Sequence, residues 1–119
     1  MADTPFLYPV HGGAHDFTRF THAGHRWLFR SFEEVASGPS IGAKTAFMIS
    51  AKYFFTALTK SKTLGLILTA PFALARAFDR LIPRKRHIDA AGGFYFVGTR
   101  SDREIFQVEV IRSYAGAQS

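Results

Sequence analysis

The stretch Phe94-Tyr95-Phe96-Val97-Gly98-Thr99 is the clearest strand signal in the chain, because aromatic and β-branched residues dominate it. Residues 90–93 before it have the composition of a turn. The segment after it is ambiguous. A capping-box pattern at residues 101–104 favours a helix that ends near Gly116, whereas the β-branched residues that follow favour a strand. We expect the helix.

Two further elements are predicted upstream of this strand. Residues 4–10 (TPFLYPV) contain two prolines, which donate no backbone hydrogen bond, so the segment suits the end of a strand that leaves a sheet. Thr21 is a good N-cap, and apolar residues follow it at helical spacing. Residues 32–37 (FEEVAS) predict a short strand, and we expect residues 38–40 (GPS) to end it.

A pair of apolar helices is predicted between these strands. Residues 42–60 carry apolar side chains at helical period, with lysines elsewhere around the helix. Ser61-Lys62 makes a tight connection, and Thr63 can cap a second helix that runs to about Ile82. We expect this second helix to kink near Pro71.

The apolar pair is too short to predict a membrane span. The apolar run from Leu64 to Ala75 is about a dozen residues long, whereas a span needs about twenty. Extending the run takes in Lys62 or Arg76, which are costly in the middle of a bilayer. We expect the phenylalanines of the helical pair to belong to a core: Phe47, Phe54, Phe55, Phe72 and Phe78. The alternatives are a lid over an active site and contact with an anionic membrane surface.

The composition is that of a folded domain, or a piece of one, with much apolar surface to bury. The chain has 119 residues, of which 47% are hydrophobic and 13 are Phe. The lack of cysteine excludes disulfides and thiolate metal sites and fits a cytoplasmic protein. A net charge of +6 admits anionic partners. We expect no nucleic acid among them, because no such motif is present and the basic triplet at residues 84–86 suits a solvated loop.

A sheet of two or three short strands needs partners on its edges. We therefore expect that a preceding, N-terminal part of the fold is missing from this chain. Exposed strand edges and many phenylalanines also predict self-association.

Several of these segments resemble the latter part of class I S-adenosylmethionine-dependent methyltransferases. Thr4-Pro5-Phe6 is similar to the exit from the family's fifth strand, and residues 16–21 (DFTRFT) to the turn that starts the next helix. Residues 32–35 (FEEV) are similar to the following short strand, and residues 93–98 (GFYFVG) to the closing antiparallel strand. Residues 41–83 resemble a helical insertion of some bacterial members. The resemblance covers most of the chain.

The resemblance implies an α/β fold, of which this chain would be the trailing half of a Rossmann-like sheet with a helical-hairpin insertion. As an isolated fragment the chain would be classed as α+β. Residues 1–40 would supply a strand exit, a substrate-side loop, a helix and a short strand. Residues 41–86 would form the insertion, and residues 87–119 the closing strand and tail. The implied reaction transfers a methyl group from S-adenosylmethionine to an unidentified acceptor, a small molecule or a lipid-like substrate.

The chain departs from the family pattern by lacking any G-x-G-x-G loop that would hold the cofactor. It also has no counterpart of the acidic residue that holds the cofactor ribose. The resemblance therefore assigns cofactor binding to the missing N-terminal methyltransferase half, and we expect this chain alone to be inactive.

His11, Asp16 and Arg19 are the substrate-side candidates. Ligands of a doubly wound sheet lie outside the carboxyl ends of its parallel strands, where the loop after residues 4–10 would lie. His11 or Asp16 would act as a base or orient a substrate hydroxyl, and Arg19 would pair with an anionic group. In the alternative interpretation Asp16 and Arg19 clamp the turn before the helix, and His11 is a surface residue.

Four histidines fall within fifteen residues: His11, His15, His22 and His25. Their spacing matches no known ligand frame, and only the last two share a helical turn, so we expect no metal site. A function of a different class is a non-catalytic module, built on residues 41–86, that binds a partner or a membrane surface. In that case we expect the protein at the periphery of a membrane.

Overall fold

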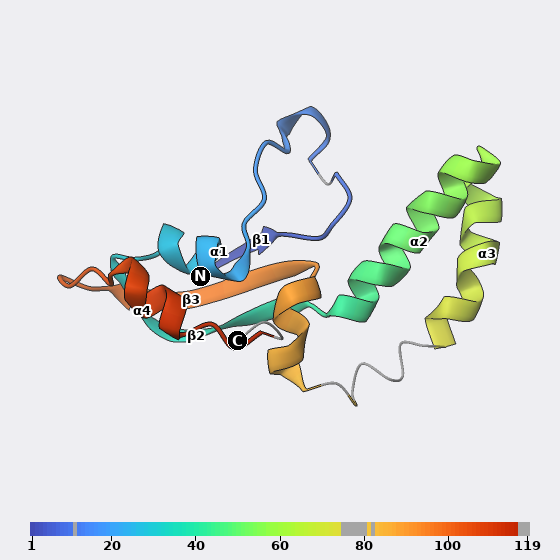
Figure 1. The fold of residues 1–119 in the computed structure, drawn as a ribbon. Helices are drawn as coiled ribbons and strands as arrows, with labels where there is room; N and C mark the ends of the chain where they lie inside the picture. The colour runs from blue at the N-terminus through green and yellow to red at the C-terminus, as the bar shows by residue number, and fades with distance from the viewer. Residues whose placement is uncertain (11, 75–80, 82, 117–119) are drawn as a thin grey trace.

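The computed structural model describes residues 1–10, 12–74, 81 and 83–116, and it combines helices with one small sheet. The sheet has three strands, which lie side by side in the order β1 (Ala2–Pro5), β3 (Gly93–Arg100) and β2 (Phe32–Ile41). β3 pairs with both neighbours in antiparallel fashion, so β1 and β2 point in the same direction (Figure 1). The architecture is therefore α+β.

Helices make up most of the remaining described chain. They are η1 (Gly13–His15), α1 (His22–Leu28), α2 (Ala43–Thr59), α3 (Lys62–Leu74), η3 (Arg84–Ala90) and α4 (Gln107–Arg112). Figure 1 shows α1 and α4 near the sheet, whereas α2 and α3 form a hairpin that projects away from it. This projection accounts for a radius of gyration of 16.4 Å, against about 13.5 Å for a compact chain of this length.

The core lies where β3 passes beneath α1. Phe94 and Phe96 are 0% and 2% exposed, and strand alternation sends both to the same face of the sheet. The ring of Phe96 stacks on Phe29 with 4.8 Å between centroids, and that of Phe94 meets His22 edge-on at 5.5 Å. The aromatic strand predicted from the sequence is therefore confirmed, and it forms the centre of the sheet.

The helix after Thr21 is also confirmed, and α1 is fixed to two strands. Thr21 Oγ1 accepts a hydrogen bond from the Gly24 N–H at 3.1 Å, as an N-cap does. Arg26 lies over the ring of Phe96, 5.2 Å from its centroid. The same side chain pairs with Glu34 of β2 at 3.1 Å. These contacts fix α1 to both β3 and β2.

β2 is longer than the sequence predicts. The prediction that residues 38–40 end the strand is wrong, because β2 continues to Ile41. Its pairing with β3 is irregular between Glu34 and Ala36 and between Pro39 and Ile41. In the described sheet β2 has a neighbour on one side only, and an edge strand with bulges tolerates a proline.

The predicted helical hairpin is present, but its details differ. Thr63 is wrong as the cap, because it lies inside α3, and Ser61 Oγ instead accepts from the Leu64 N–H at 3.4 Å. The predicted continuation to Ile82 falls mostly outside the described residues. The basic triplet at residues 84–86, predicted as a loop, belongs to η3. No described helix is long and apolar enough to cross a membrane.

The tail is helical, as expected, but α4 starts later than the predicted capping box. Glu104, a member of that box, accepts instead from Ser31 Oγ at 2.5 Å. At the actual start, the carboxylate of Glu109 accepts from the Phe106 N–H at 2.9 Å. Glu104 is therefore engaged in a contact with a distant residue and does not cap the helix as the local pattern predicts.

Candidate functional site

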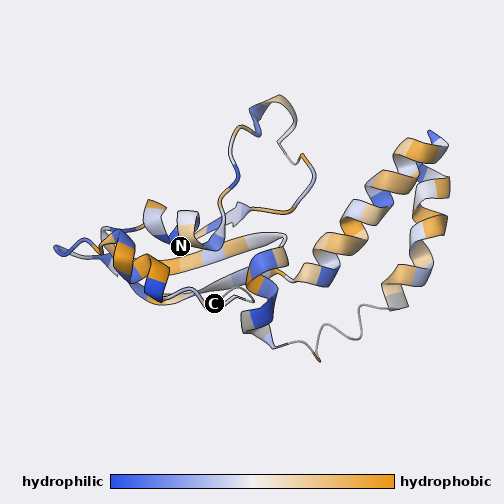
Figure 2. Ribbon diagram, viewed as in Figure 1, coloured by the Kyte–Doolittle hydropathy of each residue, from blue (hydrophilic) through white to orange (hydrophobic). Residues whose placement is uncertain are grey.

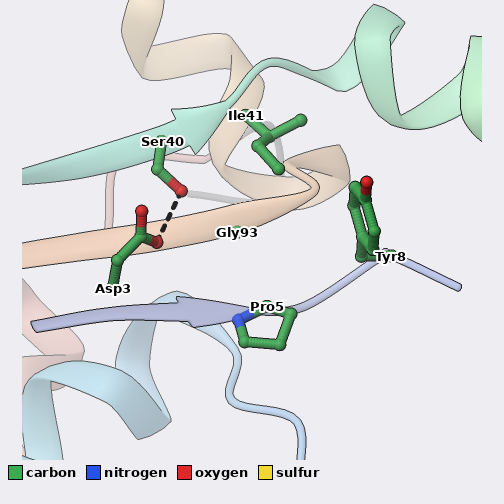
Figure 3. A pocket seen from close by; sticks show the side chains of 6 residues that line it. All are labelled: Asp3, Pro5, Tyr8, Ser40, Ile41 and Gly93. Atoms are coloured by element: carbon green, nitrogen blue, oxygen red, sulfur yellow. Dashed lines mark hydrogen bonds between the residues drawn. The ribbon is translucent and has the colours of Figure 1, made fainter. Parts of the chain in front are cut away.

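A hollow of about 320 Å³ lies beside the carboxyl ends of β1 and β2. Figure 3 shows the residues that line it: Asp3, Pro5, Tyr8, Ser40, Ile41 and Gly93. β1 ends at Pro5 and β2 ends at Ile41, so both strands point toward this region. In open α/β sheets ligands bind outside the carboxyl ends of the parallel strands. The pairings of the described sheet are antiparallel, so the hollow at the ends of β1 and β2 is the candidate site by analogy with those sheets.

A hydrogen bond joins the two parallel strands across β3. Ser40 Oγ of β2 donates to Asp3 Oδ1 of β1 at 2.8 Å, and Figure 3 shows this bond passing over the start of β3. Gly93 lies beneath it. A Cβ at residue 93 would stand 2.9 Å from Ser40 Oγ and 2.9 Å from the carbonyl oxygen of Thr4. Glycine at this position therefore leaves room for the Ser40 and Asp3 side chains to meet above β3.

The hollow offers one carboxylate and two hydroxyls beside apolar walls. Asp3 and Ser40 are exposed, so a ligand can reach both. A carboxylate accepts a hydrogen bond or a proton from a substrate hydroxyl or amine, and the Ser40 and Tyr8 hydroxyls can donate or accept. Pro5 and Ile41 supply apolar surface. The arrangement is suited to orienting a small nucleophilic group.

Sequence reasoning missed Asp3, Tyr8 and Ser40. The available signal was the position of Pro5, which marks the end of β1 and thereby the edge at which neighbouring polar residues gather. Ser40 was hidden because the segment around it was assigned to a strand break.

The predicted substrate-side residues lie on the loop that follows β1. His11 falls outside the described residues. Arg19 Nη2 pairs with Asp16 Oδ2, and the Asp16 side chain is 8% exposed. Arg19 also donates to the carbonyl oxygen of Pro9 at 3.4 Å. The pair therefore closes the loop on itself, and neither residue is among those described that line the hollow.

His22 and His25 lie on α1, on the aromatic face of β3. His25 is 2% exposed, and its Nε2 has no hydrogen-bond partner among the described residues. Burial lowers the pKa of His25, against the opposing charge of Asp3. Burial also lowers the pKa of His22, against the charge of Glu34. In the described part of the chain, no three metal-ligating side chains gather into a group that could hold an ion.

The site does not fit S-adenosylmethionine, the cofactor that the resemblance implies. A class I cofactor site needs a glycine-rich turn between a strand and a helix. Here β1 leads into Phe6-Leu7-Tyr8, β2 leads into Gly42-Ala43, and the sequence has no G-x-G-x-G. Among the described residues, the hollow therefore has no glycine-rich turn that could hold this cofactor.

No protein-family model, curated protein or solved structure matches the chain. An assignment of function therefore depends on the residues and the geometry described above.

Proposed function

We propose that this chain is the trailing part of a class I S-adenosylmethionine-dependent methyltransferase and supplies its acceptor side. The parent enzyme transfers a methyl group to an oxygen, nitrogen or carbon nucleophile, and its cofactor-binding half lies outside this chain. One observation carries the proposal. β3 lies between β1 and β2 and runs antiparallel to both, which is the role of the family's closing strand.

The edge of β1 supports a larger sheet. The Phe6 N–H donates to the Gly92 carbonyl at 2.8 Å, so the alternation of an antiparallel pair turns the amide of Asp3 away from β3. Among the described residues, β1 pairs with β3 alone. An unpaired strand edge is a ready template for a further strand. In the proposal, the cofactor-binding half supplies that strand.

The proposal gives each group at the hollow a part. Asp3 accepts a hydrogen bond or a proton from the acceptor, and Ser40 fixes the orientation of the Asp3 carboxylate. Tyr8 closes the side of the hollow next to the loop. The pair of Asp16 and Arg19 holds that loop in place, and His11 stays a predicted substrate-side residue.

Methyl transfer with site variants tests this assignment. Labelled S-adenosylmethionine is supplied to the polypeptide that includes the cofactor-binding half, and transfer to acceptors in a cell extract is counted. Asp3→Asn should lower transfer about 100-fold, as the loss of a general base does. The matched control is Asp102→Asn, which changes an exposed carboxylate in the turn after β3, and it should keep full activity. Equal transfer by both variants would remove Asp3 from the acceptor site.

A non-catalytic module is the second candidate function. The observation that favours it is the exposure of large apolar residues on the hairpin. The two functions differ in a simple respect: a methyltransferase polypeptide binds S-adenosylmethionine, whereas a module does not.

A further inference from the structure

The two helices of the hairpin approach closely at small residues near their connection, and farther along the rings of Phe47 and Phe55 in α2 meet Phe72 of α3 at 5.9 and 6.2 Å. Gly65 of α3 is buried, and a Cβ on it would lie 2.9 Å from the backbone N and Cα of Thr56 in α2. Thr69, also buried, donates its hydroxyl to the Gly65 carbonyl at 2.6 Å and is thereby satisfied within its own helix. Glycine and threonine at this contact allow the close backbone approach and contribute no large apolar side chain to it.

Several large apolar residues of the hairpin are nevertheless exposed, so the prediction that its phenylalanines belong to a core is wrong for Phe47 and Phe54. Phe47, Phe54 and Leu58 are 58%, 62% and 67% exposed, and their spacing of seven and four residues places them in one stripe along α2. Leu66 and Ile67 of α3 are exposed to a similar extent. Figure 2 shows that apolar residues recur along the length of both helices. A helical pair in water normally turns such a stripe toward a core.

The charges of the hairpin have one sign. Residues 42–74 contain four lysines and neither Asp nor Glu. Lys52 and Lys62 line a hollow of about 450 Å³ on the hairpin together with Tyr53. Lys52 precedes Phe54 by two residues, and therefore lies roughly 160° around α2 from the stripe. Long lysine stems can cross an apolar boundary and keep their ammonium groups among anions.

These observations point to one occupant of the hairpin surface. We propose that α2 and α3 bind the surface of an anionic lipid bilayer, with the stripe of Phe47, Phe54 and Leu58 in the acyl boundary and the exposed Lys52, Lys60 and Lys62 at the headgroups. The 17 residues of α2 extend about 25 Å, which is less than the hydrocarbon thickness of about 30 Å, so the hairpin lies in the interface. A second copy of the chain fits less well, because it would bring lysines together without acidic partners. The inference does not depend on methyl transfer.

Flotation of the full chain with vesicles tests the proposal. Wild type should float with vesicles that contain phosphatidylglycerol and bind pure phosphatidylcholine at least about tenfold more weakly. The double variant Phe54→Gln/Leu58→Gln should bind about 100-fold more weakly, because each side chain contributes about tenfold. Lys52→Gln/Lys62→Gln should lose about tenfold on the anionic vesicles alone.

Phe17→Gln/Val35→Gln is the matched control, because both side chains are at least as exposed (85% and 68%) and lie outside the hairpin. It should bind like wild type. Glutamine keeps helix propensity, and circular dichroism verifies the helices. The lysine pair gives a second measurement that leaves the apolar packing untouched. Equal binding to both kinds of vesicle, or an equal loss in the control, would overturn the proposal. The proposal would also be overturned if wild type formed a dimer and did not bind vesicles, and if Phe54→Gln/Leu58→Gln abolished that dimer.

Discussion

Phe94→Ala is the substitution that should cost the most stability. The side chain is 0% exposed, packs with Ile88 and Ala91, and meets the ring of Phe6 at 5.7 Å. It therefore joins β3, η3 and the end of β1. Removing a buried phenylalanine ring leaves a cavity and costs about 3–5 kcal/mol. Domains of this size are stable by about 5–15 kcal/mol, so the variant loses a large share of its free energy of unfolding.

Urea denaturation followed by the fluorescence of Trp27, the chain's single tryptophan, measures this loss. With a slope of about 1.5 kcal/mol per molar urea, the midpoint should fall by about 2–3 M. Phe17→Ala is the control, because Phe17 is 85% exposed and its loss should change stability by less than about 0.5 kcal/mol. A Phe94→Ala midpoint equal to that of wild type would refute the packing described for β3.

Three further predictions concern pH, the hairpin and the loop. Burial lowers the pKa of His25 below its usual 6.5, so the unfolded chain takes up the proton first as the pH falls. The free energy of unfolding should therefore be constant above about pH 6.5 and decrease as the pH drops below that value, less steeply in His25→Gln. A wild-type free energy that does not change with pH would contradict this. Gly65→Ala should speed amide hydrogen exchange in α2 and α3, because the added Cβ would collide with the Thr56 backbone. This cost should exceed the gain of about 1 kcal/mol in helix propensity. Slower exchange would show that the gain in propensity is the larger effect. Asp16→Asn should lower stability by about 1–3 kcal/mol, because the Asp16 carboxylate that pairs with Arg19 is largely buried. It should also speed protease cleavage between residues 9 and 19, and unchanged cleavage would mean that the Arg19 contact does not hold the loop.

The elements that the sequence predicted correctly have signals confined to a few neighbouring residues. Phe94 to Thr99 has strand composition, and Thr21 stands just before a helical apolar pattern. The hairpin is marked by its period and by the break at Ser61, although Lys62, predicted to share that break, belongs to α3. Each of these signals can be evaluated without knowledge of what packs against the segment.

The features that it missed depend on residues far apart in the chain. The length of β2 follows from its place at an edge of the sheet, and the start of α4 follows from the contact between Glu104 and Ser31. The candidate site is the clearest case. Asp3 and Ser40 are 37 residues apart and meet only because β3 holds β1 and β2 in register.

Spacing predicted that Asp16 and Arg19 lie within reach of each other, and they do pair. It did not decide whether the pair clamps the loop or meets a substrate. Which of the two roles applies depends on the residues or ligands that surround the loop in three dimensions, and a local sequence pattern does not encode them.

We propose that these strands complete the sheet of a methyltransferase whose cofactor turn lies in another part of the polypeptide. A calorimetric titration of S-adenosylmethionine into the polypeptide translated from the reading frame upstream of Met1 through Ser119 tests this proposal. We expect a strand–G-x-G-x-G–helix pattern in that frame, saturable heat from the longer polypeptide and none from residues 1–119. A frame without this pattern, together with no heat from the longer polypeptide, would contradict it.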